Sequence, residues 1–587
     1  MMRRREHRPF GLVKNLRRFA RDFLVPPGVW AAFRRVAQRR QGSVDVDPRR
    51  YWNGEDVDAP TWNVPLFLAN AVEAQTVTIG AESRDAVEAR APVELKLEAD
   101  TPSSCRIGFA VRGTGRGGGV DGFIDGEHVL ELRGLTEGAW QDVRLEIQSG
   151  HSCLRLAPTK STPVLISHPV IRPLTLSPEA ASRLPRAVII LILDSLTADL
   201  LRTYGNEAAR TPALDAFFAR ALVYENAYSQ AEWTYPALYS LVTGRDPLAH
   251  GCFERYLGSG LAPDATGTLS QEMTARGYVG LCYSTSKMFH PAFNAHLGFQ
   301  RFFYQQHQRS LSYPNITRQA IFHLDTHQDC RNFLLLDYFD THAPWLFNSE
   351  VTDSQLGPFR HVDPQGEYDG LQSEQGPTKA EPVFTREGME RLRRRAVARL
   401  HEVDLALGWL FGYLERTGLA EQSVVILLSD HGDQFRRGQQ PLLCESRTHV
   451  PLMIRAPAIP HGRIAAPVSA GIDILPTVLY LVDEGEPAAD IQGRLMPPFG
   501  RERESVISES IYEGVYQAAV RTRNFVLHVR GRYDSTRKKV LTGAGFERQL
   551  FVRTDEARCC DVKREHPEVA SRLLQQLLEH LEGHREP

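Results

Sequence analysis

Two acidic residues stand at the ends of long apolar runs, and they are the first candidates for chemistry. Residues 187–193 are apolar without interruption and end in Asp194, and a second run from 424 ends in Ser429, Asp430 and His431. Such runs are typical of strands buried on both faces of a parallel sheet. In these sheets functional groups collect beyond the carboxyl ends of the strands. Two carboxylates and an imidazole there predict a metal site.

A third candidate is Thr234, which lies two residues before Pro236 and therefore at or near the start of a helix. Free N–H groups and the helix dipole at that position favour an anionic oxygen, phosphate or sulfate. A threonine hydroxyl is a weak nucleophile at neutral pH, and a bound metal ion would lower its pKa and orient it. The aspartates, His431 and Thr234 suit one divalent cation, with Ca, Mg, Mn and Zn not distinguished. Taken singly, Thr234 and either aspartate could be an ordinary helix cap, so the prediction depends on their joint occurrence.

The elements that must position these residues alternate between strand and helix from residue 184 onward. Thr211 and Pro212 are a favourable helix start, and residues 386–417 carry an apolar stripe at helical spacing. The polar stretch 346–384 is rich in Pro, Gly and Gln and is interpreted as a surface excursion. This alternation predicts an α/β fold with a mostly parallel sheet between helices.

The segments before and after this alternating region have different sequence patterns. Residues 45–178 contain short alternating segments separated by Gly-rich turns, which predicts an antiparallel β-sandwich. A structural role is the preferred interpretation of this part, with carbohydrate binding as the alternative. Residues 501–587 predict a smaller sheet closed by an amphipathic helix that ends near Gly583.

The first 40 residues are strongly basic although the chain of 587 residues has a net charge of only −2. Twelve Lys and Arg residues face two acidic ones there, and apolar residues recur at helical spacing. A basic amphipathic helix predicts peripheral contact with an anionic membrane. The alternatives are a solvated extension and a helix packed on the enzyme. No aromatic platform supports nucleic-acid binding, so no nucleic-acid partner is expected.

The cysteine content and the absence of long apolar runs bear on location. The eight cysteines show no paired zinc-ligand spacing, which favours reduced thiols and a cytoplasmic protein, membrane-peripheral where the basic leader binds lipid. No apolar run approaches the roughly 18–20 residues that span a bilayer, and no signal peptide is expected.

The ordered set of motifs resembles the sulfatase family of the alkaline phosphatase superfamily. The matching elements begin with Asp194-Ser-Leu-Thr-Ala-Asp and continue through Thr211-Pro212, Thr243-Gly-Arg245, His250-Gly251, Asp340-Thr-His342-Ala-Pro344, Ser429-Asp-His-Gly432 and Asp473-Ile-Leu-Pro-Thr477. The resemblance runs from about 186 to 580. It implies an alkaline-phosphatase-like mixed sheet in a catalytic domain at 184–500, completed by a small α+β subdomain at 501–587. A leader at 1–44 and the β-sandwich at 45–178 lie outside it.

The resemblance also implies roles for individual residues. Asp194, Asp430 and His431 would hold the metal, and Thr234 stands where the family places its nucleophile precursor. Arg245 would support the site, and His342 would contact the transferring group or the leaving oxygen. Either Lys287 or His290 would reach the anion.

The departures from the family pattern guide the choice of substrate. Formylglycine maturation needs Cys or Ser, then Pro and Arg, but the chain has Thr234, Pro236 and Leu238. Ser195 replaces a usual second Asp, and the basic residue expected before Glu445 is missing. The prediction is a metal-dependent hydrolase or transferase of phosphate or sulfate esters, phosphate preferred, in which metal-activated Thr234 is the nucleophile. A phospho-alcohol transferase acting on a glycan or lipid head group, phosphoethanolamine-like, and a non-catalytic binding relative are the alternatives.

Overall fold

A computed structural model describes most of the chain between residues 68 and 583. The longer stretches outside the described residues are 1–67, 97–103, 174–183, 254–259, 305–311, 343–385, 434–441, 554–559 and 584–587. The predicted leader, Lys287 and the excursion 346–384 all lie outside the described residues.

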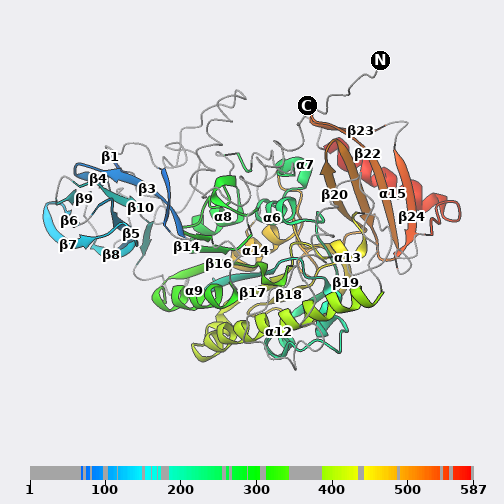
Figure 1. Cartoon of the computed structure of the whole chain (residues 1–587), viewed down its shortest axis with the longest axis horizontal. Coiled ribbons are helices and arrows are strands. Elements are labelled where there is room, and N and C mark those ends of the chain that lie inside the picture. Colours follow the sequence, from blue (N-terminus) through cyan, green and yellow to red (C-terminus); the bar gives the residue numbers. More distant parts are fainter. Residues whose placement is uncertain are drawn as a thin grey trace, which may run out of the picture.

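A large mixed sheet forms the centre of the molecule (Figure 1). Its strand order is β11-β5-β10-β3-β15-β14-β16-β12-β17-β18-β13-β19. Parallel pairing joins β15 to β14, β14 to β16, β16 to β12, β12 to β17 and β13 to β19, whereas β18 runs antiparallel to both of its neighbours. The bounds are β12 (Ala187–Leu193), β13 (Leu222–Tyr228), β14 (Tyr278–Ser284), β15 (Arg301–Tyr304), β16 (Arg331–Tyr338), β17 (Ser423–Leu428), β18 (Leu452–Arg455) and β19 (Gly462–Ser469).

Helices cover both faces of this sheet (Figure 1). One face carries α5 (Pro212–Phe217), α9 (Tyr313–Thr326) and α12 (Arg386–Arg416), and the other carries α6 (Thr234–Thr243), α8 (Leu269–Ala275) and α14 (Ile474–Asp483). The apolar residues of β12 do not alternate with polar ones because both faces of the strand are buried. Ile189 packs into the core on one face and Ile190 into the core on the other, so every residue of the strand is buried.

The N-terminal strands form two sheets around their own core. One has the order β1-β4-β9-β6-β7, and the strands of the other continue directly into the central sheet because β3 pairs with β15. The bounds are β1 (Leu68–Ala69), β2 (Gln75–Ile79), β3 (Glu82–Ala89), β4 (Val93–Lys96), β5 (Ser104–Gly113), β6 (Gly118–Ile124), β7 (Glu127–Leu135), β8 (Gln141–Gln148), β9 (Cys153–Pro158), β10 (Val164–Ser167) and β11 (Val170–Pro173).

The C-terminal part is an antiparallel sheet with one helix against it (Figure 1). The order is β20-β21-β22-β23, with β24 paired to β22. The bounds are β20 (Val506–Tyr512), β21 (Val515–Arg521), β22 (Phe525–Asp534), β23 (Lys539–Leu541), β24 (Glu547–Val552) and α15 (Pro567–Gly583). Leu573, Leu577 and Leu581 recur every four residues and form the buried stripe of α15.

The predicted fold class is confirmed: the structure is a mixed α/β fold with a large, mostly parallel sheet, N-terminal β-sheets and a small C-terminal α+β part. Within the described part of the chain, none of the helices combines the length and the apolar character needed to cross a bilayer.

Candidate active site

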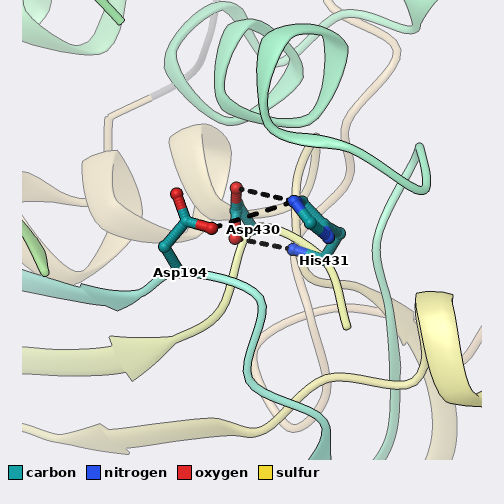
Figure 2. Close-up of side chains that lie close together, drawn as sticks. All are labelled: Asp194, Asp430 and His431. Carbon is teal, nitrogen blue, oxygen red and sulfur yellow. Dashed lines mark hydrogen bonds and ion pairs between the residues drawn. The ribbon is translucent and has the colours of Figure 1, made fainter. Parts of the chain in front are cut away.

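The two acidic strand ends meet at one edge of the central sheet. Strands β12 and β17 are parallel neighbours, with Ile192 opposite Leu428, so the residues that follow them emerge side by side. The potential ligand atoms of Asp194, Asp430 and His431 all lie within 4.8 Å of one another. Figure 2 shows the three side chains facing a common point. We call these three residues the ligand cluster.

The turn after β12 fixes the position of both aspartates. Ser195 has a left-handed backbone with φ of 61°, and its N–H donates to Oδ1 of Asp430 at 3.0 Å. The next N–H, that of Leu196, donates to the Ser429 hydroxyl at 2.9 Å. The segments that follow β12 and β17 are thus joined by direct hydrogen bonds from the backbone of one to side chains of the other.

The close packing around residue 432 requires a glycine after the Asp-His pair. A Cβ at this position would lie 2.2 Å from the carbonyl oxygen of Ser446 and 2.8 Å from Cγ2 of Thr197, too close for any side chain. Its N–H donates to the carbonyl of Arg447 at 2.7 Å. This close approach holds the peptide that carries His431.

The hydrogen bonds of His431 define its tautomer. Nδ1 lies 2.8 Å from the carbonyl oxygen of Gly432, which can only accept, so Nδ1 carries the proton. Nε2 therefore presents a lone pair toward Oδ2 of Asp430 at 3.5 Å and Oδ1 of Asp194 at 3.9 Å. A backbone carbonyl that fixes the protonated nitrogen is the usual support for an imidazole that binds a metal through the other nitrogen.

Three carboxylate oxygens of the ligand cluster accept no hydrogen bond from the described residues. Both oxygens of Asp194 and Oδ2 of Asp430 are buried, and no hydrogen-bond donor among the described residues reaches them. Burial raises the pKa of Asp194 well above its usual range, and the charges of Asp430 and Asp337 raise it further. Unpaired buried carboxylates are costly unless a cation neutralises them. Three free oxygens and one imidazole lone pair fit a divalent cation.

Thr234 lies at the same point. It is the first residue of α6, whose residues are all buried, and the preceding residue, Trp233, is extended. The Thr234 hydroxyl lies 3.2 Å from Nε2 of His431 and donates to it. The Ser195 hydroxyl is also 3.3 Å from this nitrogen. The helix start thus aims one hydroxyl at the ligand cluster.

The structure brings together only some of the other predicted residues. His342 stacks on Phe339, and its ring centroid is 6.3 Å from that of His431, so it lies at the site. The guanidinium of Arg245 instead pairs with Asp490. His290 is buried against Tyr304, and burial lowers its pKa to about 3, so its imidazole is neutral.

Two acidic residues near the site were missed in the sequence. Asp337 ends the apolar run of β16, the same signal that identified Asp194, and it is fully buried. Burial, followed by the charge of Asp430, raises the pKa of Asp337 to about 7. Its Oδ2 accepts a hydrogen bond from Ser284 at 3.0 Å. Glu232, two residues before Thr234, had no distinguishing sequence signal.

Comparisons with known proteins agree with this architecture. A family model described as Sulfatase matches residues 186–484, just over half of the chain. Arylsulfatase K of Danio rerio is 37% identical over 102 residues, which are 17% of this chain and 19% of that protein. The chain thus spans about a fifth of the length of this relative.

Two solved structures share the fold. One, solved in complex with its substrate D-glucosamine-2-N,6-O-disulfate, has a TM-score of 0.53 and 16% identity over 68% of this chain and 98% of that chain. The phosphonate monoester hydrolase of Agrobacterium radiobacter has a TM-score of 0.53 and 18% identity over 68% of this chain and 96% of that chain. The match to the family model, which takes in β12, the helix of Thr234 and β17, shows that the chain belongs to the sulfatase family.

Proposed function

We propose that the chain is a metal-dependent hydrolase or transferase of phosphate or sulfate esters, with Thr234 as its nucleophile. The observation that carries this proposal is the Thr234 hydroxyl at the start of α6, 3.2 Å from His431, whose cluster has three carboxylate oxygens without donors from the described residues. A buried hydroxyl that donates to the histidine of an acidic cluster suits nucleophilic catalysis better than a structural cap.

Asp194, Asp430 and His431 would hold the cation, with Thr234 beside them. A divalent cation bound there would lower the pKa of the threonine hydroxyl and neutralise the charge of an anionic ester. Within the described part of the chain no donor occupies three oxygens of the two aspartates, and the unprotonated Nε2 of His431 faces them.

The reaction proposed for these residues has two stages. The Thr234 oxygen attacks phosphorus or sulfur in line with the leaving alcohol, the bond to that alcohol breaks, and the group is held on the threonine. Water or an acceptor hydroxyl then takes the group and frees the side chain. The N-terminus of α6 and the nearby His342 support the negative charge that spreads over the transferring group.

Phosphate esters are the preferred substrates. A threonine cannot give the formylglycine of sulfatases, whereas it can form and release a phosphoester. Proteins with this fold include examples of both sulfur and phosphorus chemistry. One was solved with a disulfated glucosamine as substrate, and another is a phosphonate monoester hydrolase.

Metal analysis paired with a substrate panel tests the proposal. Aryl phosphate monoesters, phosphate diesters, phosphonates and sulfates are supplied to the wild type and to Thr234→Ala, each loaded with Ca, Mg, Mn or Zn. We expect turnover by the wild type and a loss of several orders of magnitude in Thr234→Ala, which should still bind the metal. Turnover that survives the substitution would exclude Thr234 as nucleophile. Ester binding without turnover in both proteins would favour a binding relative.

A further inference from the structure

The segment that leads into the nucleophile helix is held by the C-terminal sheet. The Ser508 hydroxyl donates to the carbonyl of Ser229 at 2.6 Å, and the N–H of Glu509 donates to the carbonyl of Gln230 at 2.7 Å. The next residue of β20, Ser510, donates its hydroxyl to Oε1 of Glu232 at 2.6 Å. Residues far apart in sequence therefore fix the Glu232 side chain two positions before Thr234.

Glu232 keeps one carboxylate oxygen without a partner. Its Oε2 is buried, and within the described part of the chain no donor forms a hydrogen bond with it. Burial raises the pKa of Glu232, and the hydrogen bond from Ser510 partly offsets this rise. Glu232 lies two residues before Thr234, whose hydroxyl is 3.2 Å from Nε2 of His431, so this carboxylate belongs to the segment that enters the ligand cluster. Buried polar atoms without partners are uncommon in native structures and cluster at functional sites.

The charge of Glu232 limits what it can bind. An anionic ester oxygen would be repelled by a carboxylate, and the site already holds the carboxylates of Asp194 and Asp430. A hydrogen-bond donor is the favourable partner, and an ammonium group or a hydroxyl would satisfy Oε2. The ester itself offers no such donor, so a donor supplied by the substrate would be on its alcohol part.

We propose that Oε2 of Glu232 receives a hydrogen-bond donor carried by the alcohol group of the substrate, a few atoms from the ester. The inference rests on the proposed function, because it assigns the substrate class of the same site. It makes Glu232 a specificity-determining residue that selects esters of amino alcohols or polyols over plain alkyl esters. Ser510 holds the carboxylate in place through the other oxygen, so Ser510 is a positioning residue.

Matched substrates test this assignment. The probes are p-nitrophenyl phosphodiesters whose second alcohol is 2-aminoethyl, 2-hydroxyethyl or propyl, three groups of similar size. We expect the metal-loaded wild type to show a kcat/KM at least about tenfold higher for one donor-bearing probe than for the propyl probe. A larger gain with the amine indicates a zwitterionic head group, and a larger gain with the hydroxyl indicates a sugar.

Variants connect the preference to this carboxylate. Glu232→Gln keeps the shape and one acceptor but loses the charge, so the preference for the amine should fall to about the propyl level while part of the hydroxyl preference remains. Ser510→Ala should weaken both preferences. Glu207→Gln, a substitution at an exposed position, should leave both unchanged. Equal preferences in the wild type and Glu232→Gln, or no preference in the wild type, would overturn the inference.

A binding measurement separates this inference from the proposed function. Calorimetry with 2-aminoethyl, 2-hydroxyethyl and propyl phosphate reports recognition without turnover. If the wild type turns over none of the diesters but binds the donor-bearing phosphates about tenfold more tightly, and Glu232→Gln loses that difference, only the proposed reaction fails. If the three phosphates bind equally to both proteins, the assignment of Glu232 fails whatever the activity.

Discussion

Two buried clusters of this protein contain the same residue types, two carboxylates and one histidine, and differ in what neutralises them. One is the ligand cluster. The other, which we call the C-terminal cluster, consists of Asp246 before the short helix α7 (Pro247–His250), Glu509 on β20 and His580 on α15. In both, the potential ligand atoms lie within 4.8 Å of one another.

The C-terminal cluster contains its own cation. Nδ1 of His580 lies 3.7 Å from Asp246 and Nε2 lies 3.3 Å from Glu509, so one imidazole faces both acids. Burial alone would lower the pKa of His580, but the two carboxylates raise it to about 9. Tyr516 donates a further hydrogen bond to Glu509 at 2.6 Å, and only Oε2 of Glu509 lacks a donor within the described chain.

The ligand cluster lacks an equivalent charge. His431 donates a hydrogen bond from Nδ1 to a backbone carbonyl and turns its unprotonated nitrogen toward the acids. Three carboxylate oxygens are left without donors from the described residues. Residue type alone therefore does not identify a metal site: the direction of the histidine proton distinguishes an internal ion pair from a site that takes an external cation.

The largest effect is expected from removing one charge of the ligand cluster. Asp430→Asn should lower metal occupancy and reduce turnover on the order of 10²–10³-fold or more, because both the cation and its orientation of the nucleophile are lost. Metal content by mass spectrometry and steady-state kinetics check this. The matched substitution Asp246→Asn should keep both. A loss of metal in both variants would mean that the two clusters do not differ as described.

The next effect concerns folding stability. His580→Gln removes the internal cation and leaves two buried acids facing each other, which should cost about 3–5 kcal/mol of unfolding free energy. His431→Gln in chelator-treated protein should cost only about 1 kcal/mol, because no ion pair is broken. Urea unfolding at neutral pH measures both. Similar losses in the two variants would contradict the assignment of an imidazolium to the C-terminal cluster alone.

The same histidine predicts a pH dependence. Because its pKa rises from 6.5 to about 9 on folding, protonated His580 stabilises the folded state fully below pH 6.5. That stabilisation, roughly 3 kcal/mol, is lost as the pH rises through about 9. The free energy of unfolding of the wild type should therefore approach that of His580→Gln above pH 9. A constant difference between the two proteins from pH 6 to 10 would disprove this.

The smallest predicted effect is a gain in metal affinity. Ser195 has the left-handed backbone that aspartate tolerates, and its hydroxyl is 3.3 Å from Nε2 of His431. Ser195→Asp adds a carboxylate beside the ligand cluster and should tighten divalent metal binding roughly tenfold. Competition with a chelator of known affinity measures the change. Ser195→Asn, which has the same shape without the charge, should gain less, and equal affinities for the two would argue against a charge effect.

Sequence reasoning reached the features that depend on short stretches of chain. The unbroken apolar run of β12 predicted burial on both faces, and the two cores confirm it. Asp337 ends a run of the same kind and could have been found by the same rule. Glu232 could not, because its partner Ser510 is brought to it only by the packing of β20, 278 residues away along the chain.

Sequence patterns also could not predict which strands the N-terminal strands would pair with. Alternation identifies a strand but not its neighbour, so the residues around β3 predicted a sandwich without indicating that it joins the central sheet. The roles assigned to Arg245 and His342 came from family resemblance, and only His342 lies beside the ligand cluster.

The junction between β3 and β15 has a consequence for dissecting this protein. Phe302 and Phe303 pair with Ser83 and Glu82, so the N-terminal module covers the backbone edge of the catalytic sheet. A shortened chain that starts after this module would expose the N–H and C=O groups of β15 to other chains, and such edges promote association between molecules. The module would thus serve as an edge protector, keeping the enzyme from polymerising through its own sheet.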